Sequence, residues 1–211
     1  MIWWGVPRPA DQTRHRIIDT AYALFYRSGF GRVSVDNIAA AAGVTKRTLY
    51  YHFKSKDHLL ESVLEVQGEL ALARIRKREP RYSGNSDEIL SILFSDLAKW
   101  SATPGWTGAG FTRLVMELAD LPGHPARAVA HRHKAALEAW WTGLLRKAGV
   151  AAPAERAREV MLLMEGAMAM ILIHGDRNYA FAAARAAKEL VSGNLRRRTS
   201  PGRPRKATAK R

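Results

Sequence analysis

Apolar residues recur every three or four positions along most of the chain, the spacing that places them on one face of an α-helix. The first such helix is predicted from about residues 11–13 to Ser28, and Pro7 and Pro9 are expected to prevent an earlier start. No stretch of convincing length alternates apolar and polar residues as a half-buried strand does, so the pattern predicts an all-α protein. The apolar face of the first helix consists of Ile17, Ala21, Leu24 and Phe25.

Two short helices joined by a tight turn are predicted within residues 34–53. The hydroxyl of Ser34 is suited to cap the first of them. Gly43 ends that helix, because glycine reaches a left-handed backbone conformation without steric cost, and Thr45 caps the second. The residues expected to pack this pair onto the first helix are Ile38, Leu49 and Phe53.

The second of these short helices opens with two cations, Lys46 and Arg47. Cations suit a helix N-terminus poorly, because the helix dipole is already positive there. Their placement makes sense where an anion meets them. A helix-turn-helix that offers the start of its second helix to the DNA major groove is such an arrangement.

A fourth helix is predicted from its cap, Ser55, to about Arg78, followed by a linker marked by Pro80 and Gly84. The last two helices, at about 154–174 and 177–193, have apolar and Ala-rich faces that suit close packing, so we expect them to form a dimer interface. The helices predicted after the linker are 87–101, 111–121, 126–147, 154–174 and 179–192.

The net charge of +15 is distributed unevenly along the chain. Residues 1–56 carry nine Lys and Arg against three Asp and Glu, residues 57–194 carry seventeen against sixteen, and residues 195–211 carry eight against none. Two basic ends around a nearly neutral middle indicate a polyanionic partner that the ends contact. The alternative, a generally basic surface, would spread the excess evenly.

Other classes of chemistry find little support. The absence of cysteine excludes disulfides, thiolate catalysis and cysteine zinc sites. No apolar run approaches the ~20 residues that cross a bilayer, and no signal peptide is recognisable, so we expect a cytoplasmic protein with no membrane partner. We expect no enzyme activity, cofactor or metal site, because no nucleophile–base pair or set of metal ligands is recognisable.

Several polar residues of the middle region are candidates for structural or ligand-binding roles. His124, His131 and His133 are expected on a solvated helix face, since no carboxylate lies at ligand spacing. Glu165 and His174 lie in the most apolar segment and are expected to be satisfied polar groups of the core or the dimer interface. A ligand anchor is the alternative for these two.

A family resemblance is carried by residues in order and at regular spacing between Thr13 and Leu60. They are Thr13, Ala21, Leu24, Phe25, Gly29, Phe30, Ser34 to Ala39, Ala42 to Thr45 and Thr48 to Leu60. This pattern, in about a quarter of the chain, strongly resembles the TetR-type (tetracycline-repressor-like) one-component transcriptional regulators. Asn37 departs from it, since an acidic residue is more usual there, but Asn also caps helices.

The resemblance implies an N-terminal three-helix helix-turn-helix DNA-binding domain, followed by a helical ligand-binding and dimerisation domain. The boundaries expected here are a flexible arm at 1–12, the DNA-binding domain at 13–56, a connecting helix at 57–79, the ligand-binding and dimerisation domain at 80–194, and a basic disordered tail at 195–211.

It also implies which residues meet DNA. Arg47 and Thr48 are expected to read base edges, because Arg pairs with guanine and the Thr methyl contacts thymine. Lys46 could serve base or backbone, and Tyr50 has packing as its alternative role. Contacts to phosphates are expected from Ser34, Thr45, Tyr50, Tyr51, His52 and Lys56.

A ligand pocket is expected between the helices of the middle domain. Core packing explains each candidate residue equally well. An apolar lining favours a hydrophobic or aromatic effector. The candidates are Trp106, Phe111, Met116, Trp140 and Met164.

The C-terminal segment is a second candidate for DNA contact. Arg203 and Arg205 flank a Gly-Arg-Pro core that resembles an AT-hook, which lies in the narrow minor groove of A·T-rich DNA. Pro201 stands where such a hook usually has Arg before its Gly. Non-specific phosphate contacts by a disordered cationic tail are the alternative.

Together these features predict a homodimeric, ligand-responsive regulator, most simply a repressor that binds a palindromic operator and is released by a small hydrophobic effector. A sequence-tolerant architectural DNA-binding protein that uses its basic tail is the alternative. An enzyme built on the middle domain is a third possibility, which lacks a recognisable catalytic pair.

Overall fold

The computed structural model describes residues 9–192, and within that range all regular structure is helical. The helices are α1 (Pro9–Ser28), α2 (Val35–Ala41), α3 (Lys46–His52), α4 (Lys56–Arg78), the short 3₁₀ helix η1 (Glu79–Arg81), α5 (Ser86–Trp100), α6 (Gly110–Met116), α7 (Pro125–Lys147), α8 (Pro153–His174) and α9 (Asn178–Val191). The all-α expectation is therefore confirmed for the part of the chain described. The predicted Gly-Arg-Pro contacts, Arg203 and Arg205, lie outside it.

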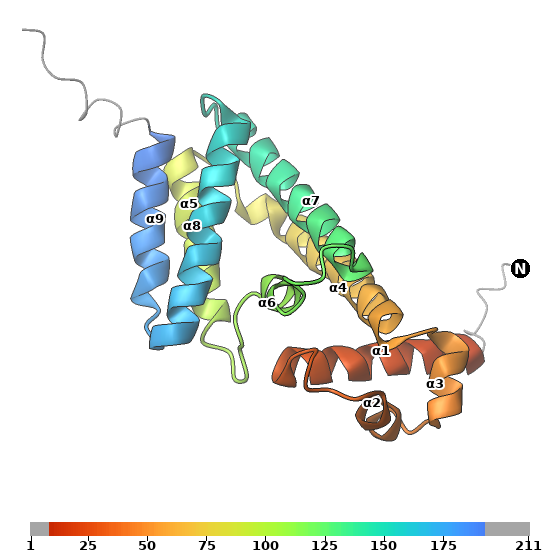
Figure 1. Ribbon diagram of the computed structural model, residues 1–211. Coiled ribbons are helices and arrows are strands. Elements are labelled where there is room, and N and C mark those ends of the chain that lie inside the picture. The colour runs from red at the N-terminus through yellow and green to blue at the C-terminus, as the bar shows by residue number, and fades with distance from the viewer. Residues whose placement is uncertain (1–8, 193–211) are drawn as a thin grey trace, which may run out of the picture.

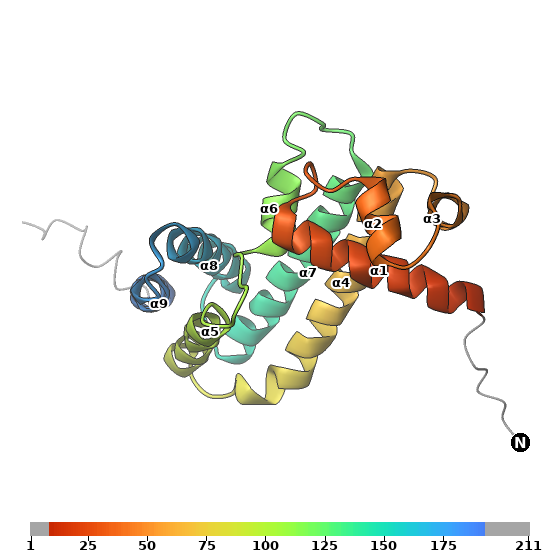
Figure 2. The ribbon, with the colours of Figure 1, turned by 90° about the horizontal axis from the view of Figure 1, so that it is seen from below.

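The helices form two groups bridged by a long parallel pair. α1, α2 and α3 gather at one end, and α5, α8 and α9 stand together at the other (Figure 1). α4 and α7 run side by side between these groups and pack on each other. α6 lies between the C-terminal group and the C-terminal end of α1, as the view from below also shows (Figure 2).

Two clusters of buried side chains correspond to these groups. The first contains Phe25, Ile38, Leu49 and Phe53, all fully buried, so α1, α2 and α3 share one core as the apolar pattern predicted. Residues from α6 and α7 complete it, among them Leu114. The second cluster joins α5, α7, α8 and α9. The N-terminal core thus draws on helices that are distant in sequence.

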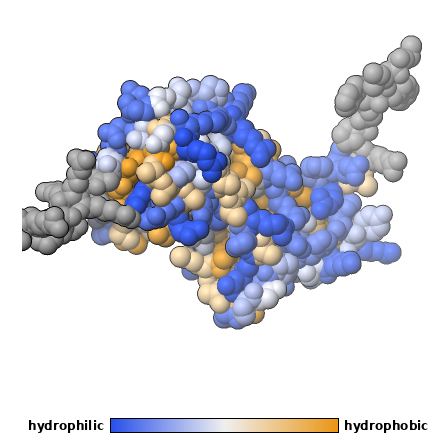
Figure 3. Space-filling view, turned by 90° about the horizontal axis from the view of Figure 1, so that it is seen from above, coloured by the Kyte–Doolittle hydropathy of each residue, from blue (hydrophilic) through white to orange (hydrophobic). Residues whose placement is uncertain are grey.

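Surface character differs between the two ends. Viewed from above, apolar surface is concentrated over the C-terminal helices, whereas the end that carries the N-terminal helices is mainly hydrophilic (Figure 3). Among the described residues, no helix is both long and apolar enough to span a membrane.

Two predicted helix boundaries were wrong. α1 begins at Pro9, so residues 9–12 are helical and do not belong to an arm. Proline is compatible with the first turn of a helix, where its missing N–H would have no partner. The helix predicted over 111–121 ends at Met116, because the chain then turns to bury Leu118 in the N-terminal core.

The histidine prediction was wrong for two of its three residues. His124 and His133 are each only 8% exposed, whereas His131 is exposed as expected. His124 caps α7, where its Nδ1 accepts a hydrogen bond from the N–H of Ala126 at 3.2 Å. His133 stacks on the ring of Phe111, with 4.1 Å between ring centroids. The burial of His133 follows from this contact between α6 and α7.

Candidate DNA interface and ligand cavity

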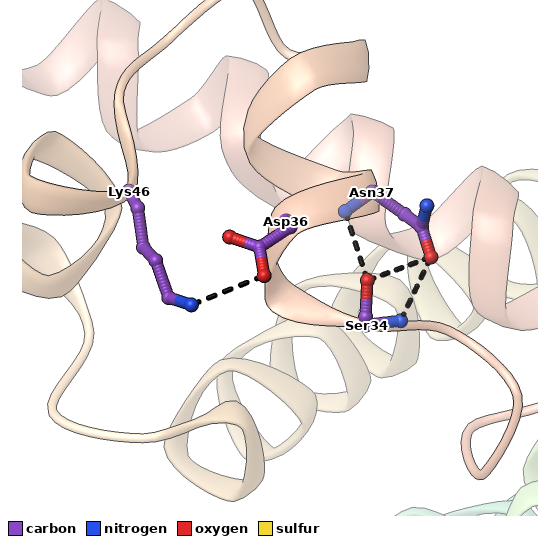
Figure 4. A network of polar contacts seen from close by, with 4 residues as sticks. All are labelled: Ser34, Asp36, Asn37 and Lys46. Atoms are coloured by element: carbon purple, nitrogen blue, oxygen red, sulfur yellow. Dashed lines mark hydrogen bonds and ion pairs between the residues drawn. The ribbon is translucent and has the colours of Figure 1, made fainter.

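The turn between α2 and α3 is built from side-chain caps and one left-handed residue. The hydroxyl of Ser34 accepts from the N–H of Asn37 at 3.1 Å, and the Asn37 side chain accepts from the N–H of Ser34 at 3.1 Å (Figure 4). Thr45 likewise accepts from the N–H of Thr48 at 3.0 Å. Gly43 has φ +62°, and a Cβ there would meet nothing within 4 Å. Backbone conformation alone therefore selects glycine at this position.

The cap at Ser34 forms a reciprocal capping box. Asn37 departs from the family pattern, but its side-chain oxygen accepts the hydrogen bond from the N–H of Ser34 that an acidic residue would accept. The cap predictions for Ser34, Thr45 and Ser55 are all confirmed. These caps fix where α2, α3 and α4 begin.

α3 turns one face inward and leaves the other open. Leu49 is fully buried beneath it. On the outer face Arg47 is exposed, and Tyr50 and Tyr51 are 45% and 81% exposed. Thr48 and His52 are half-buried. The exposed face offers a guanidinium, an ammonium and two phenols, groups that donate hydrogen bonds to bases and phosphates.

Lys46 already has an intramolecular partner, which the sequence did not reveal. Its Nζ lies 3.1 Å from Oδ2 of Asp36 on α2 (Figure 4). Both side chains are more than half exposed, at 54% and 68%. An exposed pair of this kind contributes at most about 1 kcal/mol, so phosphate can compete for Lys46.

Lys56 is less available than the sequence suggested. Its ammonium lies 4.1 Å from the centre of the Phe30 ring and is half-buried. Burial lowers its pKa, and the nearby carboxylates of Asp57 and Glu117 partly offset that effect. Its contact with phosphate stays a prediction.

Residues of α1, α4, α5, α6, α7 and α8 line a cavity of about 350 Å³. Three of the five predicted lining residues, Phe111, Trp140 and Met164, lie on its wall. The prediction was wrong for the other two. Met116 is 71% exposed, because it lies on the side of α6 opposite Leu114. Trp106 precedes α6 and packs edge-to-face on Trp100, with 5.8 Å between centroids, outside the lining.

Charged groups also line this cavity. Glu165 accepts a hydrogen bond from Oγ1 of Thr112 at 2.6 Å and pairs with Lys134. Its side chain is 27% exposed, so the expectation of a satisfied polar group agrees with its contacts. Asp96 on α5 accepts from the hydroxyl of Tyr82 at 3.1 Å and from Arg81 at 3.2 Å. Both carboxylates are therefore matched by donors.

Uncharged polar groups complete the lining. Gln67 and His133 are each 8% exposed and face the cavity from α4 and α7. Burial lowers the pKa of His133 to about 4, so its imidazole is neutral at pH 7. Gln67, Arg74 and Arg78 were missed at the sequence level. The signal was available, because they continue the apolar stripe of α4 at helical spacing.

α6 connects the cavity wall to the DNA-binding end. Thr112 reaches Glu165 in the cavity, and the next residue, Arg113, donates from Nη2 to the backbone carbonyls of Phe25 at 3.3 Å and of Tyr26. Glu117 accepts from the N–H of Gly31 at 2.9 Å. These contacts hold the C-terminal end of α1 and the loop before α2. One short helix thus links the cavity wall to the helix-turn-helix domain.

α2 and α3 are capped, joined by a turn at Gly43, and expose cations on α3. These features define a helix-turn-helix protein, and its second, helical domain contains a cavity. Residues 17–63 match the family model described as "Bacterial regulatory proteins, tetR family". Residues 17–63 therefore carry a DNA-binding domain of the tetR type, and the chain as a whole is similar to TetR-type transcriptional regulators.

Two relatives and one solved structure illustrate the likeness. The chain is 42% identical over 67 residues to the HTH-type transcriptional regulator AcrR of Shigella flexneri, across 30% of this chain and 31% of that protein. It is 34% identical over 92 residues to TtgR of Pseudomonas putida, across 42% and 44%. The matches thus span less than half the length of either relative.

A TetR-family transcriptional regulator from Streptomyces coelicolor aligns over 86% of this chain and 95% of its own, at 25% identity and a TM-score of 0.76. All three are named as transcriptional regulators, which agrees with the expectation that this chain is not an enzyme.

Proposed function

We propose that this protein is a dimeric transcriptional repressor that binds a palindromic DNA operator through α2 and α3 and releases it when a small molecule occupies the cavity. The observation that carries the DNA half of the proposal is the exposed face of α3. Arg47 stands on that face with no ion pair or hydrogen bond among the described residues. A bidentate contact between Arg and guanine needs such an open guanidinium.

The surface of α8 supports dimerisation. Leu162 and Ile173 are 69% and 67% exposed, and with Gly166 and Ala169 they form one exposed apolar stripe at helical spacing. Phe181 on α9 is 46% exposed. Apolar patches of this kind mark interaction sites on proteins. A second copy would cover the stripe and pair two α3 helices for half-sites about 34–36 Å apart.

Release of DNA is proposed to work through α4 and α6. α4 starts at the DNA-binding end and supplies a wall of the cavity, and α6 joins the same two regions through Thr112 and Arg113. A ligand that favours one arrangement of these helices by about 1–3 kcal/mol changes DNA affinity by about 5–150-fold. Pro80 and Gly84 follow α4 at the point where it would pivot.

The direct experiment is selection of DNA fragments by the full chain from a random library, followed by footprinting of the enriched sites. A palindromic footprint that survives competition with unrelated DNA at ~0.2 M salt is the expected result. Loss of all site preference under these conditions would refute the repressor and leave the architectural DNA-binding protein.

Dimerisation is tested separately with Leu162→Glu and Ile173→Glu combined in one variant, analysed by sedimentation. The control is Met116→Glu, which places one such charge at a 71% exposed apolar residue away from α8. The double variant should be monomeric and the control dimeric. A dimeric double variant would rule out this face as the interface.

A further inference from the structure

The cavity contains five charged side chains, and their pairing is asymmetric. Glu165 is held by Thr112 and Lys134, and Asp96 is held by Tyr82 and Arg81. Lys134 is thereby neutralised as well. Arg74 and Arg78 remain, and neither has an ion pair or hydrogen bond to any residue the structure describes. The unpaired charges of the cavity lining are therefore positive.

These two arginines share a face of α4 with a third unpartnered group, Gln67. The spacing 67, 74, 78 keeps all three on one stripe of the helix. Gln67 is 8% exposed, and its amide has no hydrogen-bond partner among the described residues. Because Gln67 borders the cavity, its amide is placed to exchange a hydrogen bond with a polar group of a ligand. The rise along the helix places Arg74 ~10 Å from Gln67.

The remaining wall is apolar and aromatic. Trp100, Phe111, Trp140 and Met164 contribute from four different helices. Such a wall takes up a flat ring system or an alkyl chain. His133 adds no charge, because its pKa is lowered to about 4. A cationic ligand would have to displace Lys134 or Arg81 to reach a carboxylate, whereas an anion finds Arg74 and Arg78 without a competing partner.

We propose that the effector is an elongated amphipathic anion, a hydrophobic organic carboxylate whose body lies in the aromatic part of the cavity and whose carboxylate is bound by Arg74 and Arg78. The inference rests on the proposed role of the cavity as the effector site. It also gives the ligand a direct hold on the C-terminal part of α4, the helix that begins beside the DNA-binding face.

Binding is tested by calorimetry on the full chain without DNA, using two matched series of probes. One is decanoate, decanamide and decylamine, and the other is naphthalene-2-carboxylate, its carboxamide and the corresponding methylamine. Within at least one series the carboxylate should bind about tenfold more tightly than the amide, the size expected for charge-assisted hydrogen bonds weakened by exposure to solvent.

The variant Arg74→Gln/Arg78→Gln should reduce that preference to less than twofold. The matched control is Arg76→Gln/Lys77→Gln, which removes the same charge from the same turn of α4 at residues that do not line the cavity, and it should keep the preference. Thermal unfolding of each variant checks that it is folded.

The proposal is overturned if in both series the amide or the amine binds as tightly as the carboxylate, or if the preference survives in the Arg74 and Arg78 variant. It is also overturned if neither carboxylate binds at a concentration of about 1 mM. The calorimetry contains no DNA, so its result does not depend on the proposed release mechanism. If the carboxylate binds through the arginines but does not change operator binding in a separate assay, the release mechanism is contradicted and this inference stands.

Discussion

Replacing Arg47 with alanine isolates the contribution of α3 to the choice of DNA sequence. Arg47 is exposed and makes no ion pair among the described residues, so its loss should leave the free energy of unfolding nearly unchanged. A bidentate contact to one base is worth about 1–3 kcal/mol. A dimer loses two such contacts, so the variant should lose about 2–6 kcal/mol of operator binding, at least ~30-fold in Kd.

The assay is fluorescence anisotropy with the selected operator and with a scrambled duplex of equal length, at several salt concentrations. Arg47→Ala should weaken operator binding far more than binding to the scrambled duplex. Lys99→Ala is the control, because Lys99 is an exposed cation on α5, away from the helix-turn-helix, and its loss removes the same charge. It should change both affinities little.

The reasoning about Arg47 is refuted if its loss weakens both duplexes equally and lowers the salt slope by about 0.9 for each copy of the side chain, which is the behaviour of a phosphate contact. An operator Kd within twofold of the unmodified protein's would equally remove Arg47 from the interface.

Three further changes have defined outcomes. Gly43→Ala should lower the free energy of unfolding by about 1–2 kcal/mol in urea titration, because alanine is strained in the left-handed conformation. The control Gly143→Ala, inside α7 with equally open space, should raise it by about 0.5–1 kcal/mol. Equal effects would contradict the requirement for a left-handed backbone at Gly43. The pKa of His133 is about 4 in the folded protein and 6.5 in the unfolded chain, so the unfolded state binds more protons between these values and the free energy of unfolding should fall as pH drops from 6.5 to 4. In urea titrations across this range, His133→Gln should make the free energy of unfolding depend less on pH. An unchanged dependence would assign it to other groups. Arg113→Met should leave operator binding without ligand within a few-fold and weaken its release by a carboxylate effector, measured by anisotropy; full release would exclude the contact of α6 with α1 as a coupling route.

Local structure followed from the sequence with few errors where short-range chemistry decides it. Ser34, Thr45 and Ser55 are caps because a hydroxyl reaches the free N–H groups of the following turn. The buried positions of Leu49 and Phe53 followed from helical periodicity. The start of α1 was misjudged only because proline was treated as a barrier, although a first turn accommodates it.

The cavity could be anticipated only in outline. An apolar middle domain with several Trp and Met residues indicated a hydrophobic site, and Phe111, Trp140 and Met164 line one. Which polar groups share it depends on how α4, α5, α7 and α8 cross, and periodicity within one helix carries no information about that. The burial of His133 against Phe111 has the same origin.

The sequence by itself determined the helices, their caps, the turn at Gly43 and the exposed cations of α3, because each depends on residues only a few positions apart. The tertiary structure decided which charges neutralise each other: Asp36 with Lys46, Glu165 with Lys134, and Asp96 with Arg81. It therefore also decided that Arg74 and Arg78 remain available. Side chains on different helices meet only through packing, and the interaction of two charges depends on the distance that packing sets.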